Sequence, residues 1–149
     1  MSPPGDPASA PDGTGPPDRQ TLSLLQRQFA SDDLVTDSAF EPGPLEPRWL
    51  RISIDERLYR PEIEAVKLDV RWFKSGDFSF HYVETGDENS RWECRWDRHP
   101  NRHDPRLHFH RPPDWSSVEE LSLSTHPLEV YSTVMAAIER RIEQQGDGE

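Results

Sequence analysis

The feature that most constrains the fold of this chain is a period-two alternation of apolar and polar residues between residues 48 and 110. The alternating runs are 48–55, 63–73, 78–84, 91–97 and, more briefly, 106–110. Successive side chains of a strand point to opposite faces, so this alternation predicts strands that bury one face only. Short glycine-containing connections at 74–77 and 85–90 are typical of hairpins. We therefore expect an antiparallel meander of four to five strands over residues 48–111.

Helical spacing flanks the alternating region on both sides. Leu22, Leu25 and Phe29 recur at helical intervals after Thr21, which can cap a short helix. A longer apolar stripe near the C-terminus contains Leu128, Tyr131, Val134 or Met135, Ile138 and Ile142. It predicts a helix over 126–145, with Pro127 in its first turn and Gly146 as a stop. That helix, packed on the aromatic face of the sheet, gives a two-layer α+β domain.

The ends of the chain differ in composition from its middle. Residues 1–20 contain six prolines and three glycines and have no large apolar side chain after Met1, which predicts a disordered tail. Prolines at 42, 44 and 47 indicate that residues 36–47 are a connector. We expect one domain over 21–146, with a helix and connector in 21–47 before the sheet and the final helix.

The chain is strongly acidic. The 149 residues include 28 acidic and 17 basic residues, giving a net charge of −11, and only Lys67 and Lys74 are lysines. This composition fits either a solubility strategy for a salt-rich cytoplasm or simple drift in a GC-rich genome. In both cases bulk charge disfavours non-specific binding of nucleic acid, since phosphate contacts need local cations.

Two further observations concern the cellular compartment. Cys94 is the only cysteine, which excludes an intrachain disulfide and a cysteine metal knuckle. No apolar run approaches the ~20 residues that cross a bilayer, and the N-terminus lacks the pattern of a signal peptide. We expect a soluble cytoplasmic protein without a membrane partner.

Residues 91–114 depart from the acidic character of the chain. Six arginines fall between residues 91 and 111, against Glu93, Asp97 and Asp104, and four of the six histidines lie between residues 99 and 110. Alternation predicts one apolar face with Phe80, Trp92, Trp96 and Phe109. It predicts an opposite face with His81, Arg91, Arg95, Asp97, His108 and His110.

Three kinds of chemistry can use such a set of residues. The first is metal-free RNA cleavage, in which histidines serve as base and acid and arginine stabilises the phosphorane. Its catalytic candidates are Arg95, Asp97, His103, His108 and His110, and its phosphate-binding candidates are Arg91 and Arg106. The second is a divalent metal site, with the candidate ligands His99, His103, His108 and His110, although no cofactor is predicted. The third is passive binding of an anion or a protein.

The same residues also have purely structural interpretations. A histidine-rich loop with charged neighbours is often only a solvated loop, since surface ion pairs contribute little. Glu93, Arg95 and Asp97 are also compatible with simple cross-strand ion pairs, and His81 with a hydrogen bond to a neighbour.

The order of motifs after residue 63 resembles the TumE-type proteins, the toxins of two-gene toxin–antitoxin systems. The motifs that carry the resemblance, over about residues 63–142, are Phe78–Tyr82, Arg95–Asp97, His99–Pro105, His108–His110 and Leu128–Ile142. The resemblance implies a toxin with a cognate antitoxin as its partner. Together with the histidine chemistry, it favours a toxin-module component that acts on RNA; the alternative is a non-enzymatic binding module.

Overall fold

The computed structural model describes residues 15–98, 107–110, 118–120 and 126–147, of which 107–110, 118–120 and 146–147 are described by their backbone alone. The helices are α1 (Arg19–Ala30) and α2 (Pro127–Asp147), with short 3₁₀ helices at Glu56–Leu58 and Asp87–Asn89. The strands are β1 (Val35–Glu41), β2 (Trp49–Ile54), β3 (Ile63–Trp72), β4 (Phe78–Gly86), β5 (Arg91–Arg98), β6 (Leu107–His110) and β7 (Val118–Glu120).

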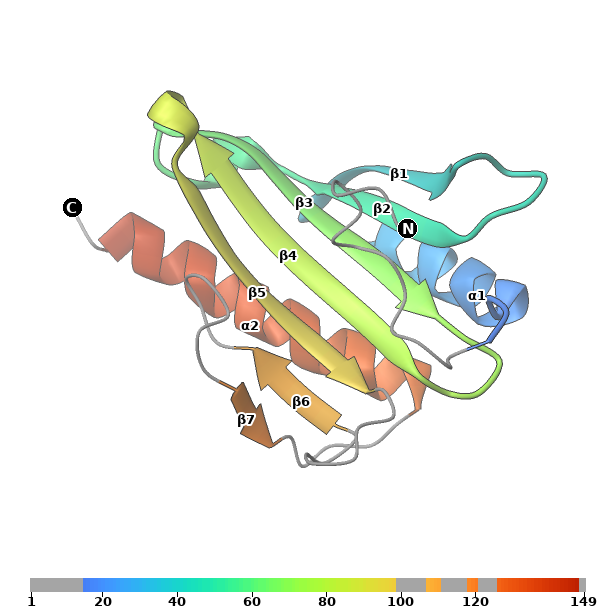
Figure 1. Cartoon of the computed structure of the whole chain (residues 1–149). Coiled ribbons are helices and arrows are strands. Elements are labelled where there is room, and N and C mark those ends of the chain that lie inside the picture. Colours follow the sequence, from blue (N-terminus) through green and yellow to red (C-terminus); the bar gives the residue numbers. More distant parts are fainter. Residues whose placement is uncertain (1–14, 99–106, 111–117, 121–125, 148–149) are drawn as a thin grey trace.

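The strands form one antiparallel sheet in the order β1 to β7, so each strand pairs with its neighbours in sequence. Both helices lie on the same face of this sheet (Figure 1). The predicted α+β fold, an antiparallel meander with a C-terminal helix on one face, is confirmed. Within 48–111 the meander has the five strands β2 to β6, and β1 and β7 extend it at the two edges.

Strand β1 lies where the sequence predicted a connector. The register between β1 and β2 shifts between Val35 and Asp37. As a result the apolar residues Val35 and Phe40 are separated by an odd number of positions, and the strand does not show a regular period of two in the sequence. The strand is held by its ladder with β2 and by a hydrogen bond of 2.9 Å from the amide of Gln26, on α1, to the hydroxyl of Ser38. A connector was therefore the wrong prediction for the first part of 36–47.

The apolar side chains that alternate along the strands form the core. The buried sheet residues are Leu50, Ile52, Ile54, Val66, Leu68, Val70, Trp72, Phe78, Phe80, Tyr82, Cys94 and Trp96. Leu22, Leu25 and Phe29 of α1 are fully buried against them, which confirms the predicted stripe. From α2 the core receives Val130, Tyr131, Val134, Met135 and Ile138, with Ile142 partly buried. Burial of this apolar surface is the main favourable contribution to folding.

The start of α1 differs from the prediction. Asp18, rather than Thr21, caps the helix, because its carboxylate accepts hydrogen bonds from the backbone N–H and the hydroxyl of Thr21 at 3.1 and 2.9 Å. The backbone N–H of Asp18 also donates to the carbonyl of Trp72 at 2.8 Å. The predicted disordered tail of 1–20 is therefore too long, since residues 15–20 belong to the fold. Residues 1–14 lie outside the described part.

A buried ion pair attaches α2 to the sheet. The guanidinium of Arg141 donates to both carboxylate oxygens of Glu84, on β4, at 2.8 and 2.9 Å. The Tyr82 hydroxyl also donates to Glu84 at 2.7 Å, and the Arg141 guanidinium lies 3.7 Å from the centroid of the Trp92 ring. The carboxylate of Glu84 is thus fully buried yet charge-paired, which is the condition under which a buried charge is tolerated.

The beginning of α2 follows the prediction. Pro127 occupies its first position, and the Nδ1 atom of His126 accepts a hydrogen bond of 3.2 Å from the backbone N–H of Leu128. His126 thus flanks and caps the helix. No helix within the described ranges is long and apolar enough to span a bilayer.

Candidate functional site on the polar face of the sheet

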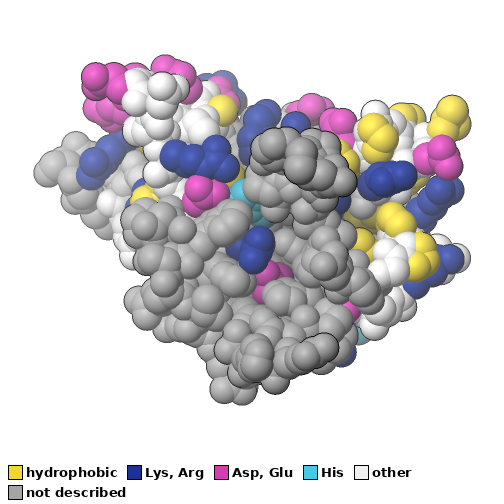
Figure 2. Space-filling view, in the orientation of Figure 1, with side chains coloured by type: hydrophobic (Ala, Val, Ile, Leu, Met, Phe, Trp, Pro, Cys, Tyr) yellow, Lys and Arg dark blue, Asp and Glu magenta, His cyan; other side chains and the backbone are white. Residues whose placement is uncertain are grey.

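The face of the sheet opposite the helices carries charged side chains. Figure 2 views this side of the molecule, where basic and acidic side chains interleave. The strand register aligns one row of residues across five strands: Arg51, Asp69, His81, Arg95 and His110. A second row contains Arg71, Ser79, Asp97, His108 and Glu120. For the residues whose side chains are described, the predicted separation into an apolar and a polar face is confirmed.

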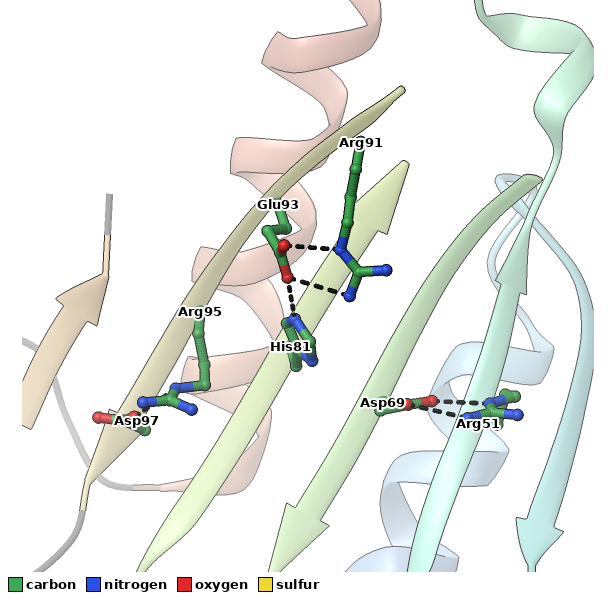
Figure 3. A network of polar contacts seen from close by, with 7 residues as sticks. All are labelled: Arg51, Asp69, His81, Arg91, Glu93, Arg95 and Asp97. Carbon is green, nitrogen blue, oxygen red and sulfur yellow. Dashed lines mark hydrogen bonds and ion pairs between the residues drawn. The ribbon is translucent and has the colours of Figure 1, made fainter. Parts of the chain in front are cut away.

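At the centre of this face His81, Glu93 and Arg91 form one connected group. The Nε2 atom of His81, on β4, lies 2.9 Å from a carboxylate oxygen of Glu93, on β5. The guanidinium of Arg91 donates to both oxygens of the same carboxylate, at 2.6 and 3.2 Å (Figure 3). Glu93 is therefore held on two sides, and its orientation fixes that of the imidazole. We call His81, Glu93 and Arg91 the His81 triad.

The surroundings of the triad change its titration. Burial lowers the pKa of His81 below its ordinary value of 6.5, and it outweighs the opposite effect of Glu93. Burial by itself raises the pKa of Glu93, but the hydrogen bonds from Arg91 and His81 outweigh it, so the pKa of Glu93 is lowered. At neutral pH the triad thus contains a neutral imidazole beside a carboxylate.

The lowered pKa of His81 predicts a loss of stability in acid. The unfolded chain binds the proton before the folded chain does, so this contribution to stability is fully present above pH ~6.5 and is lost as the pH falls through the folded pKa. We expect the free energy of unfolding, measured with urea at about pH 7.5 and about pH 5, to fall more for the wild type than for His81→Asn. Equal losses in the two proteins would contradict the burial argument.

Beside the triad, β5 carries a second ion pair. The Nε atom of Arg95 lies 2.7 Å from Oδ2 of Asp97, whose side chain is 1% exposed against 22% for Arg95. In the register with β6, Arg95 stands opposite His110 and Asp97 stands opposite His108. Antiparallel pairing therefore brings four of the five predicted catalytic residues to neighbouring backbone positions.

A third pair lies on β2 and β3, further along the row that contains Arg95. The guanidinium of Arg51, on β2, donates to both oxygens of Asp69, on β3, at 2.9 and 3.1 Å (Figure 3). It is more exposed than the Arg95–Asp97 pair and about as exposed as the Arg91–Glu93 pair.

Other predicted site residues lie outside the described part of the chain. These are His99, His103 and Arg106, and the side chains of His108 and His110. Arg91, a predicted phosphate-binding residue, is paired with Glu93. The sequence suggested Glu93 only as a member of a cross-strand ion pair. Glu93 has an odd-numbered position, as His81 and Arg95 do, and this shared face indicated that it could contact His81.

The described residues give no independent support to a metal centre. Within residues 15–98 and 126–147, no group of three or more His, Cys, Asp or Glu side chains could hold a metal ion. The predicted histidine ligands are not part of that set, so the metal interpretation stays a prediction.

The fold and its charged face define a small two-layer α+β protein with a cross-strand histidine site. The chain matches the family model described as Toxin TumE over residues 22–143, and it therefore belongs to the TumE toxin family. The match begins well before residue 63, so α1, β1 and β2 are part of the family domain as well. No curated protein and no solved structure matches the chain.

Proposed function

We propose that this member of the TumE toxin family acts by cleaving RNA, without a metal ion, on the polar face of its sheet. The observation that carries the proposal is the register of β5 and β6, which pairs Arg95 with His110 and Asp97 with His108. The register aligns the backbone positions of two histidines with those of a cation and a carboxylate, and phosphoryl transfer with histidine as acid and base uses this combination of residues.

In this scheme each residue has a defined role. His108 and His110, or one of them with His103, share the base and acid roles. Arg95 and Arg106, with Arg91, hold the phosphate, because the fork of a guanidinium matches two phosphate oxygens. Asp97 orients a histidine. The family also implies a cognate antitoxin as the protein partner, and RNA as substrate follows from the proposed chemistry.

The alternative is a binding module without catalysis, and one observation favours it. Three arginines of the face already pair with carboxylates, in Arg51–Asp69, Arg91–Glu93 and Arg95–Asp97. A face of mutually compensated charges suits recognition of a protein with complementary charges, since such pairs give specificity more than affinity.

Expression in a host without the antitoxin tests the toxin function. The wild type should arrest growth, and His108→Ala should relieve the arrest while circular dichroism shows an unchanged fold, because the variant lacks one acid–base group. His126→Asn is the matched control, since it changes a histidine at the start of α2 to another good capping residue and should still arrest growth. Absence of arrest by the wild type would contradict the proposal.

Incubation of the purified protein with labelled RNA, with and without a chelator, separates the classes of function. Cleavage that survives the chelator supports the metal-free scheme, and cleavage that stops identifies a metal site. Absence of cleavage, together with normal binding to the product of a neighbouring gene, would favour the binding module.

A further inference from the structure

We propose that a cavity at the end of the β4–β5 hairpin binds an amino-bearing purine base of the RNA and so selects the sequence that is cleaved. This inference rests on the proposed function, because it takes RNA as the substrate. The cavity has a volume of about 270 Å³, whereas one ordered water needs only about 10–15 Å³. Three parts of the chain line it: residues 60–63 around the start of β3, the hairpin end of β4 and β5, and the last turns of α2 (Figure 1).

The lining of the cavity includes a buried acceptor that needs a donor. Gln145, on α2, lines the cavity and is 8% exposed, and its Oε1 atom has no hydrogen-bond partner among the described residues. A buried acceptor without a donor costs free energy, so a ligand that supplies an N–H group is favoured there. The last torsion of a glutamine side chain is soft, so the amide can turn its oxygen to the cavity while the rest of the side chain stays in place.

The exposed rim of the cavity adds a second acceptor, the carboxylate of Glu62. Two acceptors suit a base with an exocyclic amino group, because this group carries two N–H donors. Adenine has such a group beside an acceptor nitrogen, a pattern that a glutamine amide matches with both its oxygen and its nitrogen. Uracil has one N–H donor between two carbonyl groups, so it leaves one of the two acceptors without a partner.

Two planar groups of the cavity suit stacking with a base. The Trp92 ring and the Arg141 guanidinium both line the cavity, and the guanidinium carbon lies 3.7 Å from the centroid of the ring. The two hydrogen bonds to Glu84 hold the guanidinium in this position. Bases stack both on aromatic rings and on guanidinium planes. A purine, with two fused rings, buries more surface in such a contact than a pyrimidine does.

Arg91 connects the cavity with the polar face of the sheet. Its side chain lines the cavity, is 49% exposed, and binds Glu93 through Nε and Nη2 (Figure 3). Among the described contacts none involves its third nitrogen, Nη1, which can therefore donate to a phosphate of the bound nucleotide. Four positions of β5, ~13 Å, separate Arg91 from Arg95, so the base in the cavity belongs to a nucleotide near the cleaved bond rather than at it.

The cavity takes no part in the chemical steps of the proposed cleavage. In these steps a ribose 2′-hydroxyl gives its proton to one histidine and its oxygen bonds to phosphorus, while the bond to the 5′-oxygen breaks and that oxygen takes a proton from another histidine. The products are a 2′,3′-cyclic phosphate and a 5′-hydroxyl end. The cavity should therefore change which RNA is bound and leave the reaction itself as it is.

The test is the binding of three nucleotides to the full chain, measured by an NMR titration that follows the indole N–H signal of Trp92. The nucleotides are adenosine 5′-monophosphate, purine riboside 5′-monophosphate, which lacks only the amino group, and uridine 5′-monophosphate. We expect the adenosine nucleotide to bind about 10-fold more tightly than either of the others. Gln145→Leu should remove most of this difference, whereas the control Gln144→Leu, an exposed neighbour that lines a different cavity, should leave it unchanged. Arg91→Gln should weaken the binding of all three nucleotides alike, because it removes the phosphate contact.

The outcomes distinguish this inference from the proposed function. Equal binding of the three nucleotides by the wild type would overturn the inference, even where the same protein cleaves RNA. Selective binding of the adenosine nucleotide, without cleavage of any RNA, would support the base site and overturn the proposed function. Equal losses of selectivity in Gln145→Leu and Gln144→Leu would contradict the role of Gln145. The comparison of nucleotides uses the wild type alone, so it decides even where Gln145→Leu does not fold.

Discussion

Replacing Arg141 by methionine is expected to lower the free energy of unfolding by about 3–5 kcal/mol. The variant leaves the fully buried carboxylate of Glu84 without its cation, at a place where only the Tyr82 hydroxyl still donates to it among the described contacts. The contact of the guanidinium with the Trp92 ring is lost as well. Unfolding in urea, followed by circular dichroism, measures the change.

The matched control for Arg141→Met is the double variant with Glu84→Gln. The amide removes the buried charge but still accepts a hydrogen bond from Tyr82, so the double variant should recover most of the lost stability. A loss below about 1 kcal/mol for Arg141→Met alone, the size typical of an exposed ion pair, would contradict the account of this buried pair.

The largest functional effect is expected from Arg95→Gln, which should lower the rate of RNA cleavage by about 10²- to 10³-fold. In the proposed reaction Arg95 is a charged donor at the phosphate, where negative charge develops in the transition state, and the variant removes it. Arg95 lies between His81 and His110 in the register, and its Nε atom is 2.7 Å from Asp97. Single-turnover cleavage of a labelled RNA measures the effect.

Two variants separate this effect from a change in folding. Arg95→Lys keeps a cation beside the buried Asp97 but loses the planar fork, so it should fold normally and cleave more slowly. Arg51→Gln removes an arginine of the same row, three strands away and bound to Asp69, and should change the cleavage rate little. Equal effects of Arg95→Gln and Arg51→Gln would indicate a general electrostatic role of the face instead.

The sequence was a good guide where a single physical rule decides the structure. Alternation is enough to predict β2 to β6 and to place His81, Arg91, Arg95 and Asp97 on the face away from the helices, because a one-residue slip would reverse every side chain. The helices α1 and α2 are likewise predicted by one rule, the helical spacing of their apolar residues.

The sequence was a poor guide to features that depend on contacts between two distant segments of the chain. The strand β1 was not predicted because a register shift interrupts its alternation. The cap of α1 was not predicted because Asp18 lies in a proline-rich stretch whose composition indicated disorder. The pair of Glu84 and Arg141 joins residues 57 positions apart. A glutamate on the apolar phase of β4 was its one visible signal.

The candidate site shows the same division. The face of each residue follows from alternation, but the neighbours of His81 and Arg95 follow from the registers of β4, β5 and β6, which depend on the lengths of the connections between them. Only the register shows that His81, Arg95 and His110 share one row. His99, His103 and Arg106 lie outside the described residues, so their roles stay predictions.

The central claim, attack by a ribose 2′-hydroxyl on the polar face, is tested most directly with two RNAs that differ by one oxygen. One has ribose throughout, and the other has a single 2′-deoxyribose at the site of cleavage. In the presence of a chelator, the account predicts that the wild type cuts the first RNA to a 2′,3′-cyclic phosphate and leaves the second intact at that position. Cleavage of both RNAs at the same rate would contradict it.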